Sequence, residues 1–170
     1  MNKDSPTNAA VLERAHSFAN EAMWTVALQH RRIQSPDPAD RDFIFRRWTD
    51  FQFLIVALWR LRRAAELAAN VTSVEPALRR ALQDFDTALP VLRTMRNVAE
   101  HFDEYALDSG HLRSIDRRQL QVVIGDGLGG GKNFQWLGRN INIDDALRTG
   151  EKLYLALQTA MKSYRPERAD

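Results

Sequence analysis

Apolar residues recur at helical spacing along most of the chain. From about Ser5 to Gln34 they fall three and four residues apart, a spacing that predicts an amphipathic helix. A second helix is predicted from about Asp37 to Asn70. Its middle, Phe51–Trp59, is apolar on nearly all sides, which is typical of a helix at the centre of a domain or in a subunit interface.

Two further amphipathic segments follow the second helix. The first runs from about Val74 to Ala88, and we predict one continuous helix for the second, from Pro90 to Leu107. Pro90 suits the first turn of a helix, where its missing N–H has no partner to lose. The apolar face of this second segment holds Leu92, Met95, Ala99, Phe102 and Ala106.

Beyond Leu107 the pattern favours strands before a last helix. Gln119–Ile124 and Phe134–Ile143 are β-prone runs, and the glycine-rich segment Gly125–Lys132 separates them. Because glycine adopts positive φ at little steric cost, we predict a β-hairpin over about residues 119–143. A final helix is predicted from about Asp144 towards the C-terminus.

The glycine-rich segment also matches a nucleotide-binding pattern, G-x-G-x-x-G, over residues 125–130. That pattern holds a pyrophosphate only where a helix begins directly after it, and a strand is predicted here instead. A P-loop is not matched either, because Asp126 stands where glycine is required and Asn133 where Ser or Thr is required. We interpret the segment as a plain turn, or as a hairpin tip that contacts a partner or RNA.

These elements together predict a mainly all-α fold. We expect a bundle of about five helices with a small β-hairpin before the C-terminal helix. A chain of 170 residues is long enough to bury the core of one domain. We therefore expect residues 1–170 to form a single helical domain.

Composition narrows the class of protein. Hydrophobic residues make up 44% and charged residues 27% of the chain, as in ordinary globular proteins. The absence of cysteine excludes disulfides and thiolate sites and suits a reducing cytoplasm. The N-terminal residues lack the apolar region of a signal peptide, and the longest apolar run, Phe53–Trp59, falls well below the ~20 residues of a membrane span.

Metal and cofactor patterns are not found. A di-iron bundle needs Glu-x-x-His on two helices, and Glu13–His16 is a single copy. The zinc pattern H-E-x-x-H does not occur. We therefore expect no metal and no cofactor.

The most informative residues lie in the segment 90–107. Asn97 and His101 are four residues apart and share a face of the predicted helix. Arg96 lies about 100° round the helix from Asn97, and its long side chain can swing back. An arginine, an amide and an imidazole can therefore converge on one small anion.

Arg96-Asn97 followed by His101 resembles the Arg-x(4–6)-His motif of the HEPN superfamily, in which a polar residue often follows the arginine. The resemblance implies a helical bundle that dimerises through the motif-bearing helix. It also implies a metal-independent ribonuclease, of the kind found among toxins and antiviral effectors. Arg96 and His101 would then be catalytic, and Asn97 would orient them.

RNA hydrolysis of this kind needs proton transfer and charge stabilisation, because the 2′-OH of RNA is the nucleophile. An imidazole such as His101 suits the first task, and a guanidinium such as Arg96 the second. The expected partners are RNA, a second copy of the chain bound through the motif helix, and an antitoxin or regulatory protein. We expect Arg93 and Lys132 to bind RNA. The net charge of +2 is mildly basic, weaker than that of a dedicated DNA-binding domain.

The same residues allow a plainer interpretation. Arg96 and Glu100 have the spacing of an ion pair on a helix surface, and His101 can pair with Asp103 or Glu104. In that case the chain is a non-catalytic HEPN-like binding or assembly module. A third possibility is a small-ligand site formed by the hairpin and Trp136.

Overall fold

The computed structural model describes residues 5–35, 43–125 and 131–165. These residues form six α-helices, a short 3-10 helix (η1) and three strands. In chain order they are α1 (Asn8–Gln34), α2 (Phe43–Ala68), α3 (Glu75–Ala88), α4 (Leu92–Glu100), α5 (Phe102–Ala106), η1 (Arg117–Leu120), β1 (Val123–Gly125), β2 (Asn133–Trp136), β3 (Arg139–Asn142) and α6 (Ile143–Ser163). The predicted all-α fold with a hairpin before the last helix is confirmed. The predicted start of the second helix near Asp37 lies outside the described residues.

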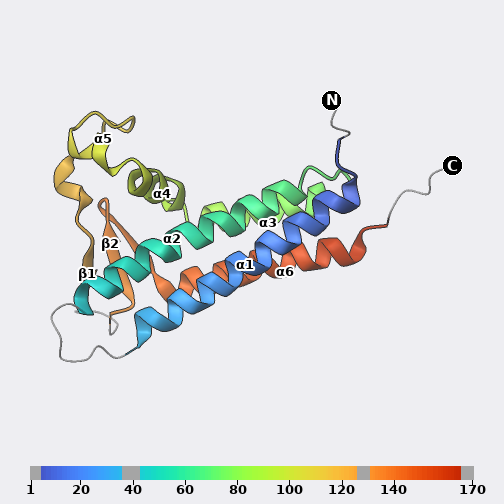
Figure 1. Ribbon diagram of the computed structural model, residues 1–170, viewed down its shortest axis with the longest axis horizontal. Helices are drawn as coiled ribbons and strands as arrows, with labels where there is room; N and C mark the ends of the chain where they lie inside the picture. The colour runs from blue at the N-terminus through green and yellow to red at the C-terminus, as the bar shows by residue number, and fades with distance from the viewer. Residues whose placement is uncertain (1–4, 36–42, 126–130, 166–170) are drawn as a thin grey trace.

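The long helices α1, α2 and α6 form the body of the molecule (Figure 1). α1 runs antiparallel to both α2 and α6, and α3 packs against α2 and α6. The start of α1 and the end of α6 lie at one end of the bundle. α4, α5 and the sheet lie towards the other end (Figure 1).

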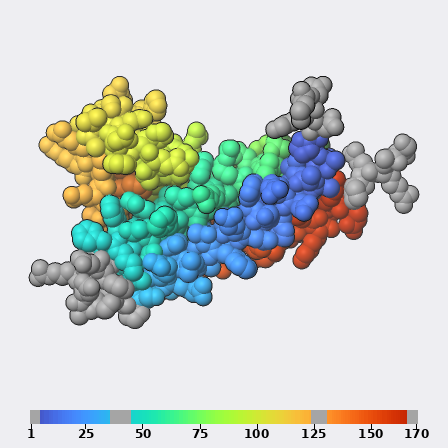
Figure 2. All heavy atoms as spheres, viewed as in Figure 1, coloured from blue at the N-terminus to red at the C-terminus, as the bar shows by residue number. Residues whose placement is uncertain are grey.

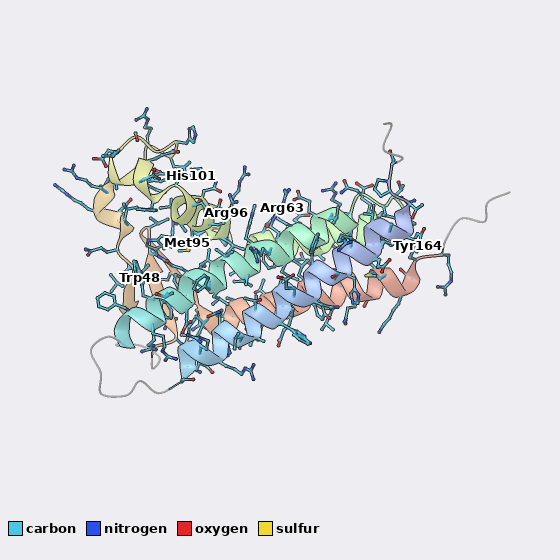
Figure 3. All side chains as sticks on the ribbon, in the orientation of Figure 1. Trp48, Arg63, Met95, Arg96, His101 and Tyr164 are labelled. Carbon is cyan, nitrogen blue, oxygen red and sulfur yellow. The ribbon has the colours of Figure 1, made fainter. Side chains whose placement is uncertain are left out.

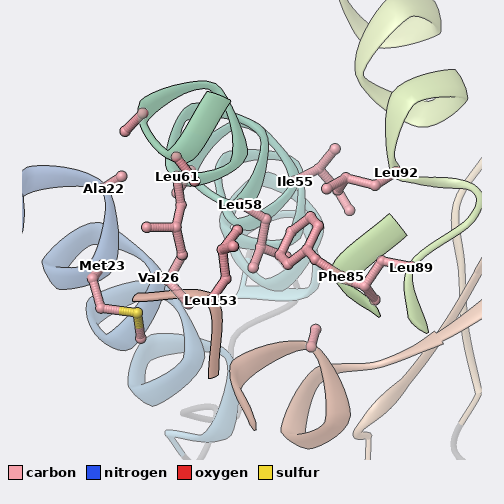
Figure 4. Close-up of a cluster of buried hydrophobic side chains, with 14 of the residues drawn as sticks. Ala22, Met23, Val26, Ile55, Leu58, Leu61, Phe85, Leu89, Leu92 and Leu153 are labelled. Atoms are coloured by element: carbon pink, nitrogen blue, oxygen red, sulfur yellow. The ribbon is translucent and has the colours of Figure 1, made fainter. Parts of the chain in front are cut away.

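α2 is the central helix, as its apolar middle predicted. It packs against α1, α3, α4 and α6, and its fully buried side chains are Phe51, Leu54, Ile55, Leu58 and Leu61. Figure 4 shows Leu58 and Leu61 beside Val26 of α1 and Leu153 of α6. Burial of each large apolar side chain stabilises the fold by about 1.5–3 kcal/mol, so α2 supplies much of the core.

The sheet is fixed to this core by aromatic residues. Its strands are antiparallel in the order β1-β2-β3. The Phe134 ring of β2 stacks on Phe51 of α2, with centroids 4.4 Å apart and ring planes 4° from parallel. The indole Nε1 of Trp136 donates to the Leu120 carbonyl at 3.0 Å, which ties η1 to the sheet.

The sheet has one strand more than the predicted hairpin. The β-prone run 134–143 is divided by a turn at Leu137 and Gly138, whose φ angles are +52° and +69°. Its last residue, Ile143, begins α6 rather than ending a strand. The Asn142 side chain caps that helix by accepting hydrogen bonds from the Asp144 and Asp145 backbone N–H groups.

The prediction of one continuous helix over residues 90–107 is wrong. α4 and α5 are separate helices joined at His101, which has φ −117° and ψ 34°. Pro90 lies before α4, and Val91 is its N-cap residue. The chain therefore changes direction within the motif itself.

Packing within α5 and the next loop accompanies this break. The Tyr105 side chain is buried, and a Cβ atom added at Gly110 would meet its ring at 2.4 Å. Figure 2 shows that α4, α5 and the loop to residue 110 project from the bundle as a lobe. We call residues 92–110 the α4–α5 lobe.

Candidate functional site

His101 is the junction of the α4–α5 lobe. Its backbone N–H donates to the Asn97 carbonyl at 3.0 Å, which is the last bond of α4, and its own dihedral angles then end the helix. The side chain is 53% exposed. Figure 3 places Arg96 and His101 in the same lobe, on α4 and at its end. The arrangement leaves the imidazole at a surface that a large substrate can reach.

The Arg96 guanidinium is held in place by three neighbours. Its Nη1 donates to Asn97 Oδ1 at 3.1 Å, and its Nη2 lies 2.5 Å from Glu100 Oε2. Its Cζ lies 6.0 Å from the centroid of the Trp59 ring on α2, within the range of a cation–π interaction. With 29% of its side chain exposed, Arg96 is oriented before any ligand arrives, although an anion must compete with Glu100.

His101 has a different partner. Its Nδ1 lies 3.2 Å from Glu104 Oε1 on α5. A carboxylate at Nδ1 favours the proton on that nitrogen and leaves Nε2 as the acceptor. Among the described residues no hydrogen bond or ion pair joins His101 to Arg96. The structure therefore brings Arg96 and Asn97 together and orients His101 separately.

Arg93 lies one turn before Arg96, at a cleft between α2, the end of α3 and the start of α4. The cleft has a volume of about 330 Å³. Its polar lining comes from Trp59, Arg62, Arg63, Glu66, Asp86 and Arg93. We call it the arginine cleft. The Arg93 side chain is exposed and has no ion pair or hydrogen bond within the described part of the chain.

Lys132 lies elsewhere, at the start of β2. Its Nζ donates to Asp144 Oδ2 at 2.8 Å, and the other carboxylate oxygen lies 2.6 Å from His30 Nε2 and accepts from Gln34 Nε2 at 2.8 Å. The hydrogen bonds from Lys132 and then His30 lower the pKa of Asp144, while burial opposes them. Lys132 therefore holds the sheet to α1 and α6, and no described contact links it to Arg93.

Two contacts at the candidate site match the plainer interpretation of the sequence. These are the ion pair between Arg96 and Glu100 and the contact between His101 and Glu104. Trp59 was predicted only as a core aromatic residue, yet its ring contacts the guanidinium groups of Arg62 and Arg96. The spacing of three residues from Trp59 to Arg62 could have indicated the first of these contacts, whereas the contact with Arg96 forms only when α4 packs on α2.

Over residues 5–35, 43–125 and 131–165, no group of three or more His, Asp or Glu side chains is placed to hold a metal ion. Over the same residues, no helix has the length and apolar content that a membrane crossing requires. The G-x-G-x-x-G pattern lies mostly in residues 126–130, outside the described residues.

Comparisons with known proteins do not assign the chain to a family. No protein-family model matches the chain, and no significant similarity to a curated protein or a solved structure is found.

Proposed function

We propose that this chain is a metal-independent endoribonuclease of the HEPN type, with its site at the junction of α4 and α5. The observation that carries the proposal is the pair of preorganised groups there. Asn97 holds the Arg96 guanidinium, and one turn later Glu104 lies at Nδ1 of an exposed histidine. Such a cation and such a base are what cleavage of RNA without a metal requires.

The reaction uses the 2′-OH of the RNA as the nucleophile. His101 Nε2 takes the 2′-OH proton as the oxygen attacks the adjacent phosphorus. The phosphorane carries extra negative charge, which Arg96 stabilises with its preorganised N–H donors. The bond to the 5′ oxygen then breaks, and that oxygen takes up a proton from water while His101 releases its own proton to the solvent. The products are a 2′,3′-cyclic phosphate and a 5′-hydroxyl.

A second copy of the chain completes the proposal. Within one chain Arg96 and His101 have separate partners, so a phosphate is best held when two α4–α5 lobes face each other across a two-fold axis. Exposed apolar residues on the lobe support this contact. Phe102, directly after His101, is 65% exposed, and Leu107 is 79% exposed, so both offer apolar surface, in the same lobe as the imidazole, that a second lobe would bury.

The wider setting follows from the same proposal. An exposed nuclease site is one that an antitoxin or regulatory protein can cover, so a toxin or defence effector fits it. The absence of cysteine fits action in the cytoplasm.

Cleavage of an RNA oligonucleotide in EDTA tests the proposal. We expect Arg96→Ala to lower the cleavage rate by about 10²–10³-fold and His101→Ala by about 10²–10⁴-fold. His111→Ala and Arg113→Ala are matched controls, because both residues are exposed in the segment that follows α5. Both variants should cleave RNA at the wild-type rate. Cleavage that survives either site substitution at the wild-type rate would reject the mechanism.

A non-catalytic RNA-binding module is the second candidate. It is favoured by the ion pair between Arg96 and Glu100, which occupies the guanidinium that the reaction needs. This candidate predicts RNA binding without cleavage. It also predicts that His101→Ala leaves the affinity for RNA nearly unchanged.

A further inference from the structure

The arginine cleft carries more positive charge than its own carboxylates neutralise. Arg62 forms a two-point ion pair with Asp86, with both N···O distances at 2.7 Å, and it also lies 3.4 Å from Glu66. Arg63 donates to the same Glu66 oxygen at 2.8 Å. Two carboxylates thus face three arginines, and Arg93 is left without a partner among the described residues.

The Arg62 guanidinium keeps its positive charge in the cleft. The hydrogen bond to Asp86 raises the pKa of the Arg62 guanidinium, against the opposing effect of burial. Arg62 stays charged and offsets one of the two carboxylates, so Arg62, Arg63 and Arg93 together exceed Asp86 and Glu66 by one positive charge. The two exposed guanidinium groups at the cleft are those of Arg93 and of Arg63, which pairs with Glu66 until a phosphate displaces that carboxylate.

The cleft adjoins the candidate catalytic site through Trp59. The Trp59 ring lines the cleft and contacts the guanidinium groups of Arg62 at 5.2 Å and Arg96 at 6.0 Å. Arg93 and Arg96 are three residues apart on α4, so they lie on the same side of the helix about one turn apart. A strand that passes along α4 meets Arg96 and Arg93 in succession.

We propose that the arginine cleft binds a phosphodiester of single-stranded RNA next to the one that is cut, through Arg63 and Arg93. The inference rests on the proposed function, because it takes RNA as the substrate. Arginine suits this contact since its planar group binds phosphate through two N–H donors. Single-stranded RNA suits the recess because its backbone is flexible, whereas a duplex is recognised across its broad grooves.

The test measures binding of an RNA oligonucleotide with 2′-O-methyl groups, which removes the nucleophile and prevents cleavage. We expect the double variant Arg63→Ala/Arg93→Ala to bind about 10-fold more weakly at 0.1 M salt. Loss of one phosphate contact should also reduce the slope of log K against log salt by about 0.7. The measurement is fluorescence anisotropy of the labelled oligonucleotide over a range of salt concentrations.

The control removes equal charge from another helix. Arg148 and Lys152 are exposed on α6, and α6 packs against α1, α2 and α3. The variant Arg148→Ala/Lys152→Ala should keep the wild-type affinity within about 2-fold. Equal losses for the two double variants would overturn the inference, because they would show a general effect of net charge. Tighter binding of a mononucleotide than of the oligonucleotide would overturn it as well.

The inference and the proposed function can fail separately. If wild-type protein cleaves unmodified RNA and the Arg63→Ala/Arg93→Ala variant binds normally, the function stands and the cleft has no role. If nothing is cleaved but the same variant loses affinity and salt dependence, the cleft binds RNA in a non-catalytic module. A change in sedimentation of this variant without a change in affinity would overturn the inference and make the cleft a contact between copies.

Discussion

At the scale of single residues, Asp144 shows how one carboxylate joins distant segments. Its oxygens contact His30 near the end of α1 and Lys132 at the start of β2. His30 and Asp144 are 114 positions apart in the chain. Because each contact involves a charged partner or a short hydrogen bond, removal of this carboxylate should lower the free energy of unfolding.

We predict that Asp144→Asn lowers the free energy of unfolding at pH 7 by about 1–3 kcal/mol. The contacts with Lys132 and His30 lower the pKa of Asp144 below its unfolded value, so their stabilisation is complete above that value, ~3.9. It is lost as the pH falls through the folded value. Urea unfolding of wild type and variant should therefore differ at pH 7, and the difference should narrow below about pH 4.

Asp145→Asn is the control for this prediction. Asp145 shares the first turn of α6 with Asp144, and its carboxylate pairs within the described part of the chain only with Arg148 on the same helix. The substitution should lower the free energy of unfolding by a few tenths of a kcal/mol. Equal losses at Asp144 and Asp145, or a difference that does not change with pH, would contradict the account of this carboxylate.

At the scale of elements, the helical stripes predicted the long helices well. The apolar spacing is local, and the side chains that it selects on α2 are the buried ones. The break at His101 could not be predicted in the same way, because the residues around it include no proline or glycine. It goes together with the packing of Tyr105 on Gly110, which is a contact formed only in the folded chain.

The third strand was missed for a related reason. Leu137 adopts a positive φ, a conformation usually taken by glycine or asparagine, so the run 134–143 looked continuous. The candidate site was predictable where its contacts are local, as for Arg96 with its neighbours on α4. Lys132 pairs with Asp144 at the start of α6, and Asp144 in turn contacts His30 of α1. No spacing in the sequence indicates these contacts.

The packing of α5 against the loop at Gly110 gives a prediction at the scale of elements. Gly110→Ala would place a Cβ atom 2.4 Å from the buried Tyr105 ring, and overpacking of this kind costs about 1–3 kcal/mol. Displacement of α5 also moves Glu104 away from His101, so we expect slower RNA cleavage as well as lower stability. Urea unfolding and the cleavage rate in EDTA are the two measurements.

Gly138→Ala separates stability from function in this experiment. Gly138 has a φ of +69° but open space around its Cβ position, with Gln119 at 4.0 Å. The substitution should lower the free energy of unfolding by about 1 kcal/mol and leave the rate of RNA cleavage by the folded protein unchanged. If Gly110→Ala cleaves RNA as fast as Gly138→Ala, the position of α5 does not matter for the reaction.

At the scale of the whole molecule, the α4–α5 lobe projects from the bundle (Figure 2), while Leu92, Met95 and Val98 of α4 are buried against it. The bundle supplies a buried core through α1, α2, α3 and α6, whereas the lobe presents His101 together with exposed Phe102 and Leu107. This division suits a rigid scaffold that holds one working surface. That surface is where we place both the second copy and the RNA.

We predict that Phe102→Glu/Leu107→Glu converts a dimer to a monomer and abolishes cleavage, because buried like charges oppose the contact between lobes. Sedimentation velocity gives the oligomeric state. Trp24→Glu is the control, since Trp24 is 82% exposed on α1, a helix outside the lobe. A wild-type chain that sediments as a monomer while cleaving RNA would contradict the shared site.

The chemistry at Arg96 and His101 is tested most directly by the ends of the RNA products. Mass spectrometry of an oligonucleotide cut in EDTA should find 2′,3′-cyclic phosphate and 5′-hydroxyl ends with the wild-type protein. Neither should be found with His101→Ala. Products that end in 3′-hydroxyl and 5′-phosphate, or cyclic phosphate formed at the wild-type rate without the imidazole, would contradict attack by the 2′-OH at this site.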